Sequence, residues 1–145
     1  MNMTDQAKLP IWFWIVGVVA LLWNGIGVLA YLQQVIMSAE EFAALPEAQQ
    51  NVLSTQPVWV TAAFAIAVFA GFVASISWLL KKRIAVRLFL LSLLAVIVQC
   101  SSYFIVDGYQ EFLSGQGWLM PALILLFAIG FLLFAWQAEK KGLLR

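Results

Sequence analysis

Four long apolar stretches constrain the fold of this chain more than any other feature. They cover about residues 11–36, 58–80, 86–106 and 118–137, and Arg87 is the one charged residue within them. Each stretch is close to the ~20 residues with which a helix crosses a hydrocarbon core of ~30 Å. Only 10% of the 145 residues are charged, whereas a soluble domain has about 25%. We therefore predict an all-α integral membrane protein in which residues 1–145 form one domain, an up-and-down bundle of four transmembrane helices.

The charged residues predict how these helices are threaded. All eight Lys and Arg residues lie on one side of the predicted spans and five of the seven acids on the other: Lys8, Lys81, Lys82, Arg83, Arg87, Lys140, Lys141 and Arg145 against Glu40, Glu41, Glu47, Asp107 and Glu111. The positive-inside rule then favours a multi-pass protein with both termini cytoplasmic and with the loops 37–57 and 107–117 on the opposite, periplasmic side. Recognition of anionic lipid headgroups by the basic cluster 81–87 is an alternative use of the same charges.

Tryptophans mark the ends of two spans. Trp59 and Trp78 bracket the second span, and Trp118 and Trp136 bracket the fourth. The two residues of each pair are about 28 Å apart along a helix that rises ~1.5 Å per residue. Because Trp is enriched at membrane–water interfaces, we predict that these four side chains lie near the two membrane surfaces.

The first span contains one amide side chain, Asn24, in an otherwise apolar run. A polar group without a partner in hydrocarbon costs several kcal/mol, so this amide needs a hydrogen-bond partner. Small and polar residues recur every three or four positions along this span, and this spacing puts them on one inward face: Gly17, Ala20, Asn24, Gly27 and Tyr31. Asn24 therefore either joins helices or takes part in a solute site.

Small residues also recur in the second span, at intervals of four: Ala63, Ala67, Gly71 and Ser75. Such a stripe lets another backbone approach closely. Together with Gly17 and Gly27 in the first span, these residues are the predicted helix-packing positions.

The third span carries a polar patch. Gln99 and Ser102 share one face with Ser92 and Ala95, and this face is expected to point inward. Counted from Trp12 and from Arg87, Asn24 and Gln99 fall at matching depths. We predict that the two amides are linked through the bundle core, directly or through one water, with Ser102 as a supplementary acceptor.

The segment 37–57 is the longest polar stretch. Ser38 and Glu41 form the pattern of a capping box, which begins a helix. Pro46 then breaks the helix, because Leu45 before it is disfavoured in helical conformation. We expect one or two short helices lying in the interface plane. A solvated connector and a substrate lid are the alternatives.

The residue inventory excludes most enzyme chemistry. The chain has no His and a single Cys, so it lacks an internal disulfide, a Cys/His catalytic pair and the usual transition-metal ligands. It also shows no phosphate loop or nucleotide-binding fingerprint. We expect no enzyme activity, no catalytic residue, no metal or other cofactor and no nucleic-acid partner. The absence of a charge deep within the spans argues against ion-coupled transport.

Several segments spread over the first half of the chain resemble one protein group. They are Pro10-Ile-Trp-Phe-Trp14, Leu22-Trp-Asn-Gly-Ile-Gly27, Tyr31-Leu-Gln-Gln-Val-Ile-Met37, Leu45-Pro-Glu-Ala-Gln49 and the run from Pro57 to Phe69. These segments are similar to those of small four-span bacterial inner-membrane proteins that often carry the label "sugar transporter". The resemblance implies a four-span topology and brings no set of functional residues.

Two classes of function follow. The first is a facilitative conduit for a small neutral polar, sugar-like solute, built as a homo-oligomer, with five ligand-binding candidates: Trp23, Asn24, Tyr31, Gln99 and Ser102. The second is a non-catalytic accessory subunit that packs against a larger membrane partner. The small face of the second span discriminates between them. If it is covered within the monomer, a partner is less needed; if it faces lipid, it is an interface.

Overall fold

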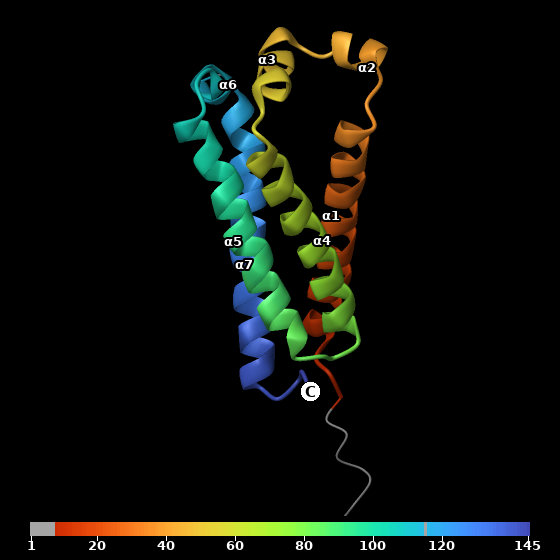
Figure 1. Ribbon diagram of the computed structural model, residues 1–145. Helices are drawn as coiled ribbons and strands as arrows, with labels where there is room; N and C mark the ends of the chain where they lie inside the picture. Colours follow the sequence, from red (N-terminus) through yellow and green to blue (C-terminus); the bar gives the residue numbers. More distant parts are fainter. Residues whose placement is uncertain (1–7, 115) are drawn as a thin grey trace, which may run out of the picture.

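The computed structural model describes residues 8–114 and 116–145 and contains four long helices (Figure 1). These are α1 (Ile11–Val35), α4 (Val58–Leu79), α5 (Ile84–Ile105) and α7 (Leu119–Lys140). Each is long and apolar enough to cross a membrane. The predicted all-α four-helix bundle is therefore confirmed. The predicted cytoplasmic segment before Lys8 and Gly115 of the predicted 107–117 loop lie outside the described residues.

Short helices connect the long ones at one end of the bundle. α2 (Ala39–Ala43) and α3 (Glu47–Thr55) follow α1, and α6 (Tyr109–Ser114) and the 3₁₀ turn η1 (Gln116–Trp118) follow α5. The predicted capping box is confirmed, because Ser38 Oγ accepts from Glu41 N at 3.2 Å and Glu41 Oε2 accepts from Ser38 N at 2.8 Å. Pro46 directly precedes α3, so the break that it predicts is also present.

The large helix contacts follow the order of the chain. α1 packs on α4, α4 on α5 and α5 on α7, whereas α1 and α7 meet at only a few positions. In Figure 1 the lower ends of α1 and α4 come together and their upper ends diverge, with α2 and α3 spanning the space between them. The backbones of α1 and α4 are therefore closest at the lower end of the bundle and further apart at its upper end.

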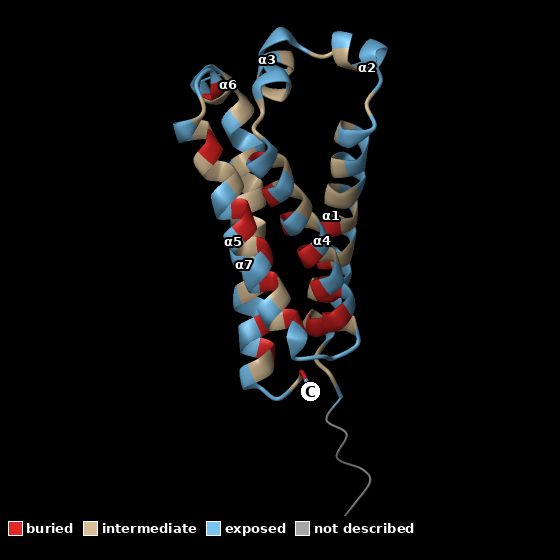
Figure 2. Ribbon diagram, viewed as in Figure 1, coloured by how far each residue is buried: buried red, intermediate tan, exposed pale blue. Residues whose placement is uncertain are grey.

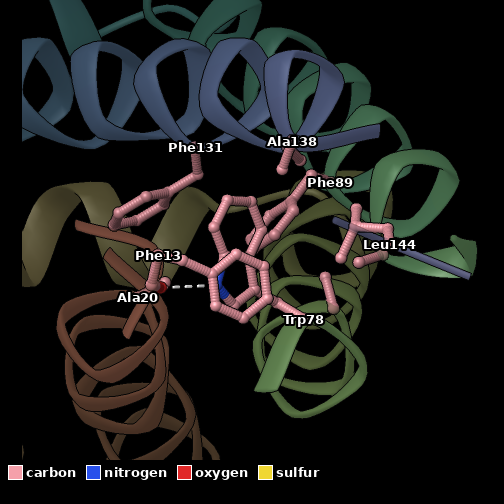
Figure 3. Close-up of a cluster of buried hydrophobic side chains, with 10 residues drawn as sticks. Phe13, Ala20, Trp78, Phe89, Phe131, Ala138 and Leu144 are labelled. Carbon is pink, nitrogen blue, oxygen red and sulfur yellow. Dashed lines mark hydrogen bonds between the residues drawn. The ribbon is translucent and has the colours of Figure 1, made fainter. Parts of the chain in front are cut away.

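The tightly packed lower end contains the main apolar core (Figure 3). The rings of Phe13 and Trp78 stack with centroids 4.8 Å apart, and Phe89, Phe131 and Leu144 join them in the cluster. Trp78 Nε1 donates a hydrogen bond to the Phe13 carbonyl oxygen at 2.8 Å. Trp78 is thus only 1% exposed and is a core residue. It still lies in the last turn of α4, at the end of the span that it was predicted to bracket. The start of α1 covers it, and an indole N–H can be buried when it finds an acceptor.

The C-terminal tail folds back against this core. Arg145 N donates to the Lys81 carbonyl oxygen at 2.6 Å, and Arg83 N donates to the Arg145 carbonyl oxygen at 3.1 Å. Leu144, which directly precedes Arg145 in the tail after α7, is completely buried. The tail is therefore held against the turn between α4 and α5.

The predicted packing stripe of α4 is buried between α1 and α5 (Figure 2). All four of its members, Ala63, Ala67, Gly71 and Ser75, are buried. A Cβ atom added to Gly17 would lie 2.6 Å from both Leu79 Cδ2 and Trp78 Cδ1, and one added to Gly27 would lie 3.0 Å from Val68 Cγ1. The predicted glycines of α1 thus give room to larger side chains of α4 within a single chain.

Candidate functional site

A cavity of about 290 Å³ lies between the four long helices. It begins above the core, where Phe89 and Phe131 pack with ring centroids 5.8 Å apart. Its wall is made by residues of all four helices: Trp23, Asn24, Ile26, Gly27, Ala30, Phe64, Ala67, Val68, Phe89, Ser92, Val96, Gln99, Met120, Ile124, Ala128 and Phe131. The volume is near the lower limit of typical small-molecule sites, which is ~300 Å³. The cavity is therefore the candidate functional site.

Asn24 finds its partners on α1 and α4. Its Nδ2 donates to the Ala20 carbonyl oxygen at 2.8 Å and to Ser75 Oγ at 3.4 Å. Ser75 Oγ in turn donates to the Gly71 carbonyl oxygen at 2.7 Å. The direct form of the predicted link between Asn24 and Gln99 is not present among the described residues. Ser75, which the sequence placed only in the packing stripe, takes this role instead.

Gly71 allows three helices to meet at this level. An added Cβ atom would collide with Asn24 Oδ1, and it would lie 2.8 Å from Asn24 Cγ and 3.1 Å from Ser92 Oγ. Ser92 reaches across from α5 and donates to the Ala67 carbonyl oxygen at 2.7 Å. A side chain at position 71 would therefore displace polar groups on both sides of α4.

One oxygen of this cluster stays available to the cavity. Asn24 Oδ1 accepts no hydrogen bond within the described part of the chain. Yet no fully enclosed side-chain nitrogen or oxygen there lacks a partner. Oδ1 is therefore not fully enclosed, and Asn24 lines the cavity. It provides one acceptor for a bound molecule.

Gln99 provides a second amide, higher in the cavity. Ser92 lies level with Gly71, and Gln99 is two turns further along α5, about 10 Å away. Its side chain is half-buried and has no hydrogen-bond partner among residues 8–114 and 116–145. The two amides therefore share one cavity at different depths, each with hydrogen-bonding capacity that the protein does not use.

Trp23 closes the lower part of the seam between α1 and α7. Its ring stacks on Phe127 with centroids 4.2 Å apart and planes inclined by 29°. Nearer the upper end of the bundle, Ile26 of α1 and Met120 of α7 line the cavity although their side chains are 64% and 58% exposed. The wall of the cavity thus reaches the outer surface of the bundle, and the opening lies between α1 and α7.

Two predicted ligand-binding residues lie outside this wall. Tyr31 packs edge-on against Phe64 and Phe69 of α4, with centroids 5.5 and 5.8 Å away. Ser102 is 1% exposed and donates to the Gln99 carbonyl oxygen at 2.6 Å, a bond to its own helix that serine commonly makes. The structure thus brings Trp23, Asn24 and Gln99 together in the cavity and places Tyr31 and Ser102 behind it.

The apolar part of the wall was not among the predicted site residues. Ile124, Ala128 and Phe131 recur at intervals of four and three on α7, and this spacing could have marked one inward face. Every lining side chain is uncharged. In the described ranges, no group of three or more Cys, Asp or Glu side chains could hold a metal ion. The cavity is suited to binding, with hydrocarbon walls and a few neutral polar groups.

Comparison with known proteins found no matching family model, no matching curated protein and no matching solved structure. The resemblance to four-span inner-membrane proteins stays a prediction. The geometry of the cavity is therefore the basis on which a function is proposed.

Proposed function

We propose that this protein binds, within the bilayer, a small and mainly apolar molecule that carries one neutral polar group. The supporting observation is the pairing of a hydrocarbon-walled cavity with two amides, those of Asn24 and Gln99, whose hydrogen-bonding capacity is not fully used inside the protein. A hydroxyl, carbonyl or amide group on the ligand would bond to one of the two amides. The remainder of the ligand would contact Phe64, Val96 and Ile124.

The composition of the wall favours this ligand class over a sugar. A sugar displays hydroxyl groups on most sides, and each one that is buried without a partner is costly. Of the three polar residues in the wall, Ser92 already donates its proton to Ala67. The two amides and the acceptor lone pairs of Ser92 Oγ then remain for the ligand, which are too few partners for the hydroxyl groups of a sugar. The proposed ligand is therefore neutral, as predicted from the sequence, but it is an amphiphile and not a sugar.

We propose that the ligand enters sideways from the lipid, through the seam between α1 and α7. These two helices make few contacts, and exposed Ile26 and Met120 form the rim. An apolar molecule is already concentrated in the bilayer, so lateral entry needs no aqueous path. Transfer between the membrane leaflets or between membranes is the activity that such a site would serve.

The cavity is complete within one chain, so the proposal does not require a homo-oligomer. An accessory function requires a small-residue face on the surface of the bundle. The small-residue face of α4 is covered by α1 and α5, which favours the binding function over the accessory one. For the location, we propose the bacterial inner membrane, with Lys8, the α4–α5 turn and the tail cytoplasmic and α2 and α3 periplasmic.

A photoreactive alkyl alcohol tests the proposal, with the protein reconstituted in lipid nanodiscs. We expect the probe to label cavity residues and octanol, but not glucose, to compete. Ala128→Trp fills the cavity and should reduce labelling about tenfold or more, because ligand and ring cannot occupy it together. Ala122→Trp, on the exposed side of the same helix, is the matched control. Equal labelling of both variants, or competition by glucose alone, would contradict the proposal.

A further inference from the structure

The lower end of the bundle collects every basic residue of the chain. All eight are described and exposed: Lys8, Lys81, Lys82, Arg83, Arg87, Lys140, Lys141 and Arg145. They come from the start of α1, the α4–α5 turn and the end of α7, which Figure 1 shows at one end of the molecule. Glu139 is the only acid of the described residues at this end. The end therefore carries a strong and largely uncompensated positive charge.

The tail and the turn are fixed relative to each other. The two backbone bonds between Arg145 and the turn are joined by a third, from Arg83 Nε to the Leu144 carbonyl oxygen at 3.3 Å. Leu144 is completely buried in the core beneath them. Basic side chains that are far apart in the sequence thus form one defined surface. The positive-inside rule requires only that such charges stay on one side, and it does not require this docking.

Tryptophan rings place three of these ammonium groups at a defined depth. Lys140 Nζ lies 3.6 Å from the centre of the Trp136 ring, Lys141 Nζ lies 5.4 Å from that of Trp12, and Lys81 Nζ lies 5.8 Å from that of Trp14. Trp14 and Trp136 are 42% and 50% exposed on the outside of the bundle. Because Trp rings favour the headgroup level of a membrane, the ammonium groups beside them lie where lipid phosphates are found.

We propose that this surface is a binding site for anionic phospholipids, which it recognises through their headgroup phosphates. Several exposed cations at headgroup depth attract an anionic lipid over a zwitterionic one. The acyl chains of the bound lipid would lie along the exposed apolar side of α1 and α7. This site is separate from the central cavity, and it does not depend on the ligand proposed there.

Native mass spectrometry of protein released from nanodiscs tests the site, with phosphatidylglycerol and phosphatidylcholine in equal amounts. We expect retained lipid to be mainly phosphatidylglycerol, and free inorganic phosphate to leave this preference unchanged. The double variant Lys82→Gln/Lys141→Gln should reduce the preference about tenfold, since each cation near the surface contributes substantially. The control Gln49→Glu/Gln110→Glu changes the net charge equally at the opposite end and should retain the preference.

Leu144→Ser tests the docking of the tail apart from the charge. The variant is expected to release the tail from the core, and it keeps every basic residue. We expect this variant to lose part of the preference for phosphatidylglycerol. An unchanged preference in Leu144→Ser would overturn the role of docking. If that variant does not fold, the two double variants decide alone. An equal loss in both double variants, displacement by phosphate, or no preference in the original protein would overturn the site.

Discussion

The indole of Trp78 is held by Phe13 in two ways, since its Nε1 donates to the Phe13 carbonyl oxygen at 2.8 Å while the two rings stack 4.8 Å apart. This pair joins the first turn of α1 to the last turn of α4. It is the point from which the two helices diverge toward the cavity. The pair therefore joins α1 to α4 at the end of the bundle where the two helices are closest.

Replacing Trp78 by Phe is expected to lower the free energy of unfolding by about 1–3 kcal/mol, because it removes a buried hydrogen bond and part of a core ring. Trp59→Phe is the control, since Trp59 is 40% exposed, and it should change stability by no more than about 0.5 kcal/mol. Thermal unfolding in one detergent measures both. Similar losses in the two variants would argue against the Trp78–Phe13 pair.

Gly71→Ala is expected to destabilise the bundle by about 1–3 kcal/mol, because the new methyl group collides with Asn24 Oδ1 and crowds Ser92. Gly130→Ala makes the same chemical change in α7, where an added Cβ atom meets nothing within 4 Å. It should be neutral or slightly stabilising, since Ala favours helix. Unfolding curves that rank the two variants in the opposite order would contradict the close approach at Gly71.

Double-mutant cycles distinguish the two partners considered for Asn24. The pair Asn24→Leu and Ser75→Ala should show a coupling of about 0.6 kcal/mol, the average for hydrogen bonds between membrane helices. The pair Asn24→Leu and Gln99→Leu should be additive, because two helical turns separate the two amides. Stability in lipid nanodiscs provides the readout. Coupling only in the second cycle would restore the link to Gln99 that the sequence predicts.

The orientation in the membrane is tested by cysteine labelling in intact cells. In a Cys100→Ser background, Lys82→Cys should resist an impermeant thiol reagent, and Gln50→Cys should react with it. Labelling both variants after the cells are opened confirms that each thiol is reactive. Reaction at position 82 and not at position 50 in intact cells would reverse the orientation.

Much of the bundle is predictable from local sequence. The four spans follow from length and hydropathy, and the inward face of α4 follows from the repeat that ends at Gly71 and Ser75. The capping box at Ser38 is likewise a local pattern. These features depend on residues within one or two helical turns of each other, so their physics can be evaluated without the rest of the chain.

Features that depend on how distant segments meet were not predictable in the same way. The predicted equal depths of Asn24 and Gln99 require Trp12 and Arg87 to lie in the same plane of the membrane. In the structure, Ser92 reaches the level of Asn24, which leaves Gln99 two turns higher. The spacing of Trp78 from Trp59 indicates that Trp78 ends a span, but it does not show that the ring packs inside the bundle. Its burial depends on α1 and on the tail around Leu144, and no local pattern contains either.

The sequence also could not define the cavity. Its volume depends on the angle at which α1 leaves α4, and this angle is determined by contacts such as those of Gly17 and Trp78 at the lower end. Single residues of the wall, Asn24 and Gln99 among them, stood out because they are polar. The apolar residues beside them look like any other membrane-helix residues until the packing is known.

The order of the helix contacts has a consequence for biosynthesis. Each large interface joins two spans that are consecutive among the four long helices, α1 with α4, α4 with α5 and α5 with α7. Every hairpin can therefore form as soon as its second helix enters the bilayer, without waiting for a distant segment. The last helix to arrive packs mainly on α5 and makes few contacts with the first, among them the Trp12–Phe134 and Trp23–Phe127 ring pairs. The seam that these pairs hold is the last interface to be made and the least costly one to part.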